Sequence, residues 1–243
     1  MIFVPYFVGE RSRESARLGE GEVVEPPLPE GPAQRRLAVL YEALAARVQA
    51  AARPRVQVGD CTAALGVMAG LQRRGLDPWL IWLDAHGDFN TWQTTPSGFL
   101  GGMPLAMLAG LGEQTVMQAL GLRPLGAERI LLAGARDLDP GERDNLARAR
   151  VPLVTVEELA GRPPPPGPVY VHLDVDVVNL SEMPAVDYPA PGGPAAAEVR
   201  AALDHVFAEA EVAAFSVTGW NPEQHGSERS RATAEALVRG LVD

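Results

Sequence analysis

The sequence has one cysteine, few aromatic residues and no long apolar run. The chain of 243 residues contains a single Cys, and aromatic residues make up only 6% of it. One cysteine excludes an internal disulfide framework and a zinc site built from cysteines alone. Because no stretch of about 18 apolar residues occurs, the sequence predicts no membrane-spanning helix. Residues 1–8 lack the charged region and cleavage pattern of a signal peptide, so we expect a cytoplasmic protein.

Basic residues are also scarce. The chain carries 21 Lys and Arg against 31 Asp and Glu, which gives a formal net charge of -10. This balance argues against nucleic acid or an anionic membrane as the main partner, and we expect a small-molecule substrate. Hydrophobic residues at 47% and charged residues at 21% are ordinary for a globular protein, which excludes global disorder. The length and the even composition favour one domain over residues 1–243.

Apolar runs of strand length alternate with stretches of helix length. Several runs are apolar without polar alternation, which is typical of strands covered on both faces. The strand candidates are residues 1–8, 56–58, 79–83, 129–133, 151–154, 169–173 and 213–217, and the helix candidates are residues 33–51, 62–74, 102–111, 140–150, 194–209 and 227–241. Residues 10–32 and the proline-rich residues 162–168 interrupt the alternation, and we interpret them as a surface excursion and a stiff connector. The pattern predicts a parallel sheet with helices on both faces.

Side chains with metal-ligand chemistry follow three of these strands. They are Cys61, Asp84, His86, Asp88, Asp174 and Asp176. In an open parallel sheet, ligands bind beyond the carboxyl ends of the strands. Alternate residues share one side of a strand, so Asp84 with His86 and Asp174 with Asp176 can converge on one point.

A divalent cation is the interpretation that best explains these two acidic motifs. Clustered carboxylates repel one another and raise their own pKa values, and a bound cation relieves that repulsion. Carboxylates with one imidazole suit Mn²⁺, with Zn²⁺, Fe²⁺ or Co²⁺ as alternatives. A single acidic loop after a strand would more often only cap the next helix. Two such motifs after two apolar strands, one of them with a histidine, favour a metal site.

These motifs resemble those of a known family. Residues 84–90 read Asp-Ala-His-Gly-Asp-Phe-Asn, and together with Ser97-Gly98 and residues 102–105 they resemble the signature of the ureohydrolases, which are arginases, agmatinases and formiminoglutamases. Residues 174–176 resemble the second metal motif of that family, and residues 188–193 and Asn221-Pro222 its later motifs. The resemblance implies a three-layer α/β/α sandwich around a mostly parallel eight-stranded sheet. It also implies hydrolysis of a guanidino or formimino C–N bond by a metal-bound hydroxide shared by two Mn²⁺ ions.

The resemblance also implies roles for the metal ligands. Asp84 and Asp174 fall at positions that bridge two ions, His86 and Asp176 at ligands of one ion, and Asp88 at a ligand of the other. Cys61 stands where the family has a histidine. As a thiolate it could bind Zn²⁺ or Fe²⁺, whereas as a buried, inert thiol it would leave a site for one ion.

Other positions depart from the family pattern. Gly101 replaces a histidine that is proposed to relay protons, and Gly219 replaces a carboxylate that grips the guanidinium group. Phe99 replaces a polar residue of the substrate loop. Arginase and agmatinase activities are therefore not expected, because an unpaired buried cation is costly.

The candidate substrate-binding residues are Asn90, Ser97 and Tyr188, of which Asn90 and Ser97 match the family and Tyr188 replaces a small residue. Glu223 or His225, which follow Asn221-Pro222, could replace the lost acid–base groups if they come within hydrogen-bond reach.

Two hypotheses remain. The first is a metal-dependent hydrolase of a non-peptide C–N bond in a small guanidino, formimino or amidine compound. The second is a catalytically inactive protein of the same fold that serves in binding or assembly. A metallophosphoesterase is disfavoured, since few basic residues lie near the acidic motifs. Family members usually form trimers or hexamers, so the resemblance implies a homo-oligomer.

Overall fold

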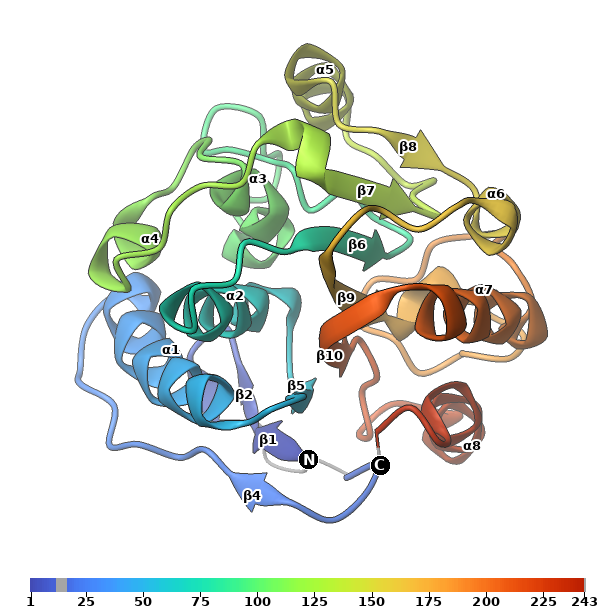
Figure 1. Cartoon of the computed structure of the whole chain (residues 1–243), viewed down its shortest axis with the longest axis horizontal. Helices are drawn as coiled ribbons and strands as arrows, with labels where there is room; N and C mark the ends of the chain where they lie inside the picture. The colour runs from blue at the N-terminus through green and yellow to red at the C-terminus, as the bar shows by residue number, and fades with distance from the viewer. Residues whose placement is uncertain (12–16, 243) are drawn as a thin grey trace.

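A parallel sheet of eight strands forms the centre of the molecule. Figure 1 shows the computed structural model of the chain, of which residues 1–11 and 17–242 are described. The strand order is β4-β1-β5-β10-β9-β6-β7-β8, and neighbouring strands of this sheet pair in parallel. The strands are β1 (Ile2–Val4), β4 (Glu22–Val23), β5 (Arg55–Val58), β6 (Trp79–Leu83), β7 (Ile130–Ala133), β8 (Leu153–Val154), β9 (Pro168–Asp174) and β10 (Glu211–Thr218). A small antiparallel ribbon joins β2 (Tyr6–Phe7) to β3 (Glu10–Arg11).

Helices cover both faces of this sheet and make a three-layer α/β/α sandwich. In Figure 1, α1 to α4 lie on one side of the sheet and α6 to α8 on the other. The helices are α1 (Ala33–Ala50), α2 (Ala64–Arg73), α3 (Pro104–Leu108), α4 (Thr115–Ala119), α5 (Pro140–Ala149), α6 (Val156–Gly161), α7 (Ala196–Glu209) and α8 (Ser227–Val238). Short 3₁₀ helices are η1 (Cys61–Ala63), η2 (Leu100–Gly102), η3 (Ala127–Arg129) and η4 (Val175–Val177).

The apolar core is divided by the sheet into two clusters. Alternate residues of one strand enter different clusters: Leu80 and Trp82 of β6 pack with α1 to α4, while Ile81 and Leu83 pack with α6 to α8. Both faces of β6 are therefore buried, which explains why this strand is apolar without alternation. Burial of both faces fixes the register of the central strands, because a slip of one residue would exchange the two clusters.

The predicted parallel sheet with helices on both faces is confirmed. The structure differs from the prediction in short elements. The edge strand β4 lies within the segment predicted as a surface excursion, and the sequence pattern does not predict the short helices α4 and α6. Residues 12–16 of that same segment lie outside the described part of the chain. Residues 62–74 divide into η1 and α2, and the predicted helix over 102–111 is only α3, preceded by η2.

The topology brings the carboxyl ends of five neighbouring strands to one edge. These are β5, β10, β9, β6 and β7, which are adjacent in the sheet order. Since all of them run parallel, the segments that follow them meet at the same edge.

No helix in the described ranges is long and apolar enough to cross a membrane.

Candidate functional site

The turn after β6 holds Asp84 in a fixed orientation. Asp84 is 1% exposed, and each of its carboxylate oxygens has a protein partner. Oδ1 accepts a hydrogen bond from the His86 backbone N–H at 2.7 Å, and Oδ2 accepts one from Trp82 Nε1 at 3.0 Å. Trp82 is itself fully buried in β6. The sheet interior therefore positions this carboxylate directly.

The segment after β9 is positioned in a similar way. Asp174 Oδ1 accepts the Asp176 N–H at 2.9 Å, and Asp176 Oδ1 accepts the Ala85 N–H at 3.0 Å, which ties the two strand exits together. The Arg136 guanidinium donates to the backbone carbonyls of Asp176 at 3.1 Å and of Val177 at 3.0 Å. Two neighbouring segments thus fix the turn that carries Asp174 and Asp176.

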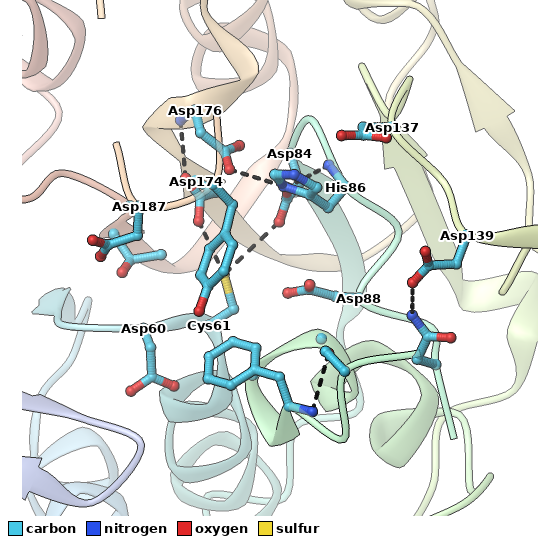
Figure 2. Close-up of a pocket in the computed structure, with 18 of the residues that line it drawn as sticks. Asp60, Cys61, Asp84, His86, Asp88, Asp137, Asp139, Asp174, Asp176 and Asp187 are labelled. Atoms are coloured by element: carbon cyan, nitrogen blue, oxygen red, sulfur yellow. Dashed lines mark hydrogen bonds and ion pairs between the residues drawn. The ribbon is translucent and has the colours of Figure 1, made fainter. Parts of the chain in front are cut away.

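The predicted ligand residues converge in two overlapping groups. Cys61 Sγ lies 3.2 Å from Asp174 Oδ2 and 3.8 Å from Asp84 Oδ2. His86 Nδ1 lies 2.9 Å from Asp176 Oδ2 and 3.4 Å from Asp84 Oδ1. In each group, Cys61–Asp84–Asp174 and Asp84–His86–Asp176, the candidate ligand atoms lie within 4.8 Å of one another. Figure 2 shows these side chains pointing toward one another from the three strand exits.

Asp88 completes this arrangement and is unusual in two respects. Its Oδ2 atom is buried and has no hydrogen-bond partner among the described residues. Its backbone has φ 49°, a left-handed conformation that few residues other than glycine adopt. Figure 2 shows the Asp88 carboxylate pointing toward Cys61. A buried carboxylate oxygen without a partner is costly, and a cation at this place would satisfy it.

Burial and mutual repulsion shift the pKa values of these groups. Burial and then the charge of Asp176 raise the pKa of Asp174 to about 8. Burial and the charge of Asp84 raise the pKa of Asp176 to about 6 and that of Asp88 well above its usual value. Burial lowers the pKa of His86, but hydrogen bonds to Asp176 and Asp84 outweigh this and raise it to about 12. Without a cation, the site therefore retains protons.

The metal-free protein is expected to lose stability as pH rises from about 5 to about 8. Because the folded-state pKa values of Asp174 and Asp176 exceed their unfolded values, the folded state binds more protons over this range, and raising the pH favours unfolding. The raised pKa of His86 acts in the same direction above its ordinary value of 6.5. Thermal unfolding in the presence of a chelator at several pH values measures this. A Tm that rises over this range would contradict the arrangement of charges.

These groups form the floor of a cavity of about 380 Å³. Among the described residues that line it, many carry carboxyl groups and none is Lys or Arg. The carboxyl groups belong to Asp60, Asp84, Asp88, Asp137, Asp139, Glu142, Asp174, Asp176 and Asp187. The cavity therefore favours cations, whether metal ions or a basic substrate.

Sequence reasoning missed the acidic residues that follow β7. Asp137, Asp139 and Glu142 line the cavity, whereas the sequence pattern predicts only a helix over residues 140–150 here. Asp139 Oδ2 accepts a hydrogen bond from Asn90 Nδ2 at 2.9 Å. Glu142 is 3% exposed and accepts the backbone N–H of Phe89 at 2.8 Å and of Asp139 at 3.2 Å. The position of β7 beside β6 was the signal that could have placed these residues at the same edge.

The candidate substrate residues Asn90, Ser97 and Tyr188 all line the cavity. Glu223 and His225 do not: both are exposed, and neither is among the described residues that line it. Asn221, just before them, donates from Nδ2 to Asp187 Oδ1 at 2.6 Å and accepts the Glu223 N–H at 2.8 Å, which fixes the local turn. The structure therefore does not bring Glu223 or His225 to the reacting groups.

Gly101 and Gly219 lie in close contact with neighbouring side chains. A Cβ atom at Gly219, which has φ 94°, would lie 1.7 Å from Asp174 Oδ1. A Cβ atom at Gly101 would lie 2.2 Å from Phe99 Cε1. A side chain at either position therefore requires that Asp174 or Phe99 moves.

The donor set is suited to divalent metal ions. It combines carboxylate oxygens with one imidazole and one thiol, it includes the unpartnered Asp88 Oδ2, and its acids are mutually repulsive while no cation is bound. The thiol is in its protonated form here, since burial and the charges of Asp88 and Asp174 raise the pKa of Cys61 well above its usual value. A bound cation would instead favour the thiolate form of Cys61.

Comparisons with known proteins agree with the geometry. A family model described as "Arginase family" matches residues 20–242. The arginase of Bacillus subtilis is 30% identical over 202 residues, which cover 78% of this chain and 68% of that protein. An N(omega)-hydroxy-L-arginine amidinohydrolase of Streptomyces lavendulae is 35% identical over 153 residues, 61% of this chain and 54% of that protein. A crystal structure of Bacillus subtilis arginase superposes with a TM-score of 0.82 at 26% identity, over 99% of this chain and 96% of that one.

Proposed function

The chain belongs to the arginase family, and from this premise we propose that it is a metal-dependent hydrolase of a non-peptide C–N bond. Its substrate is a small guanidino, formimino or amidine compound other than arginine or agmatine. The observation that carries this proposal is the convergence of Cys61, His86 and four buried carboxylates on the cavity floor. The cofactor we propose is Mn²⁺, as one or two ions, with Zn²⁺ or Fe²⁺ as alternatives.

Each ligand residue has a defined part in this proposal. Asp84, which belongs to both donor groups, and Asp174, His86, Asp176, Cys61 and Asp88 would together hold one or two divalent ions. Divalent ions bound there would lower the pKa of water and supply a nucleophile near neutral pH. The hydrogen bonds from Trp82 and Ala85 hold Asp84 and Asp176 in place, so little reorganisation is needed when ions bind.

The remaining carboxylates orient the substrate. Asp137 and Asp139 border the same cavity and can attract N–H groups of a cationic or neutral substrate. Asn90 is held by its hydrogen bond to Asp139, so its orientation is fixed before substrate enters. Glu142 acts through the backbone, because its carboxylate accepts the N–H groups of Phe89 and Asp139 and so fixes the loop.

Arginine and agmatine are not proposed as substrates because Gly219 stands where the family resemblance implies a carboxylate that binds the guanidinium group. A guanidinium group in this site would instead pair with other acids of the cavity, such as Asp137 and Asp139. One relative is named for the hydrolysis of Nω-hydroxy-L-arginine, which is a guanidino compound other than arginine.

Hydrolysis of a compound panel tests the proposal. Guanidino, formimino and amidine compounds are incubated with protein loaded with Mn²⁺, Zn²⁺ or Fe²⁺, and release of urea, formamide or ammonia is measured. Turnover of at least one compound, abolished by a chelator and absent in a sample of Asp84→Asn, is the expected result. If no compound turns over with any of these metals, the proposal fails.

An inactive protein of this fold is the second candidate. It is favoured by the glycines at positions 101 and 219, where the family resemblance implies a histidine and a carboxylate, and a side chain at either position would collide with Phe99 or Asp174. Such a protein would bind the same compounds without cleaving them. Binding by calorimetry without turnover therefore distinguishes it from the enzyme.

Cys61 is expected to act as a metal ligand, because its sulfur lies against both Asp84 and Asp174. Loading with Co²⁺ should produce a sulfur-to-cobalt charge-transfer band in the near ultraviolet. Cys61→Ser should remove this band and weaken Zn²⁺ binding by at least about tenfold, since a soft thiolate is lost. Since Cys61 is the single cysteine, the band can have no other source. An unchanged Zn²⁺ affinity in Cys61→Ser would mean that the thiol is inert and the site holds one ion.

A further inference from the structure

Three aromatic side chains from distant parts of the chain meet on one side of the cavity. Phe7 lies on β2, Phe99 precedes η2, and Tyr188 follows η4 in the long segment before α7. The rings of Phe7 and Phe99 are stacked, with centroids 5.9 Å apart and planes 20° apart, and those of Phe99 and Tyr188 are 5.3 Å apart. All three line the cavity. We refer to Phe7, Phe99 and Tyr188 as the aromatic wall.

The aromatic wall reaches the metal-ligating residues. The Tyr188 ring meets His86 edge-on, with centroids 6.4 Å apart. At the centre of the wall, the Phe99 ring lies directly against the backbone of Gly101, which leaves no room for a Cβ atom there. The ring therefore occupies the space into which a side chain at position 101 would project. The aromatic wall therefore presents an apolar surface beside the metal-ligating residues.

This apolar surface remains open to the solvent in the cavity. Tyr188 is 48% exposed, and Phe7 and Phe99 are only partly buried. An apolar wall inside a concave site with a polar floor is typical of a ligand pocket, where the wall binds the apolar part of the ligand. The many carboxyl groups that line the rest of the cavity require that this ligand is not an anion.

We propose that the aromatic wall binds an aryl group on the substrate, so that this site takes aryl-substituted guanidines or amidines. This inference rests on the proposed function, since it names the substrate class of the same site. The amidine or guanidine carbon would lie over the acidic floor, and the aryl ring would pack against the aromatic wall. A small aliphatic guanidine would bind at the acidic floor, and the aromatic wall would remain exposed to water.

Equilibrium binding of two matched compounds tests the inference. Phenylguanidine and methylguanidine carry the same reactive group, and only the first has a ring. Calorimetry with the Mn²⁺-loaded protein should show phenylguanidine binding at least about tenfold more tightly, and hydrolysis of both is measured in parallel. Phe99→Ala and Tyr188→Ala should each reduce this preference about threefold to tenfold, as expected for the loss of a ring contact.

A second variant moves the ring without removing it. Gly101→Ala should displace Phe99 and reduce the preference for phenylguanidine, although every aromatic residue is still present. Trp92→Ala is the control: Trp92 is 41% exposed and outside the cavity lining, so its loss should leave the preference unchanged. Since Tyr188 is on the surface, its replacement leaves the core intact and keeps the test decisive if Phe99→Ala fails to fold.

The two proposals fail in different ways. Preferential binding of phenylguanidine that depends on the aromatic wall, without turnover, supports the inference while the hydrolase proposal fails. Turnover with equal affinity for both compounds overturns the inference while the hydrolase proposal stands. A preference that persists in both Phe99→Ala and Tyr188→Ala also overturns it.

Discussion

Replacing Asp174 with asparagine is expected to lower kcat/KM by at least about a thousandfold, which corresponds to about 4 kcal/mol of transition-state stabilisation. Asp174 lies between Cys61 on one side and the Asp176 turn on the other, and its carboxylate belongs to the donor group with Asp84. Asparagine keeps the shape of the side chain but removes the charge that attracts a cation. Metal affinity and turnover should therefore fall together.

In the metal-free protein, the same substitution should increase the stability of the folded state. Since burial and the charge of Asp176 hold the pKa of Asp174 at about 8, an ionised Asp174 destabilises the folded state when no cation is present. Asp174→Asn should thus raise the Tm in chelator at pH 8 while abolishing the increase in Tm that metal provides. Asp144→Asn is the control, because Asp144 is an exposed acid whose ion pair with Arg148 is long, at 3.8 Å. An Asp174→Asn protein with unchanged metal affinity would refute the assigned role.

Replacing Gly219 with alanine is expected to destabilise the protein by at least about 3 kcal/mol and to remove metal binding. The added methyl group would lie 1.7 Å from Asp174 Oδ1, so the carboxylate must leave its position. For the same reason Gly219→Glu should not produce arginase activity, although it adds a carboxylate to the cavity. Chemical denaturation and metal titration measure the two effects.

Gly192 provides a matched control for the backbone part of this effect. It has φ 79°, close to the value of 94° at Gly219, but a Cβ atom at Gly192 would meet nothing within 4 Å. Gly192→Ala should therefore cost only about 1 kcal/mol, which is the penalty of the left-handed backbone, and should leave metal binding intact. Equal effects at Gly192 and Gly219 would show that the contact with Asp174 has no consequence.

The sheet could be predicted from the sequence because its central strands are buried on both faces. The runs at 79–83 and 169–173 are apolar throughout, and they form β6 and β9 at the middle of the sheet. β4 could not be predicted in the same way, because it has two residues, is exposed at Glu22, and pairs only at the edge with β1. Its pairing comes from tertiary contacts rather than from a local pattern.

The acidic floor was predictable for a topological reason. Residues that directly follow parallel strands must gather at one edge, which is why Asp84, His86, Asp174 and Asp176 lie together. Their exact contacts, such as the hydrogen bond between Trp82 Nε1 and Asp84 Oδ2, depend on side-chain directions that spacing does not give.

The aromatic wall was not predictable as a unit. Phe99 and Tyr188 could be recognised only as departures from the family, and Phe7 only as part of a first strand. These three residues are far apart in the sequence, and no periodic pattern connects them. Their stacking arises because the β2 ribbon and the segments around Phe99 and Tyr188 border the same cavity.

His172 illustrates a related ambiguity. It lies in the apolar strand β9 and is fully buried, as a core histidine would be, with Nδ1 at 2.7 Å from Ser216 Oγ. Its Nε2 atom has no partner among the described residues, so only one of its two nitrogens is satisfied. Burial lowers the pKa of His172 to about 3, which keeps the ring neutral beside Trp82.

Metal content tests the central claim most directly, which is that the buried acids form a metal centre. Purified protein is incubated in turn with Mn²⁺, Zn²⁺ and Fe²⁺, freed of unbound ions, and analysed by elemental mass spectrometry beside Asp84→Asn. At least one equivalent, and up to two, is predicted for the unmodified protein with at least one of these metals, and much less for the variant. Less than half an equivalent with each metal would contradict the account.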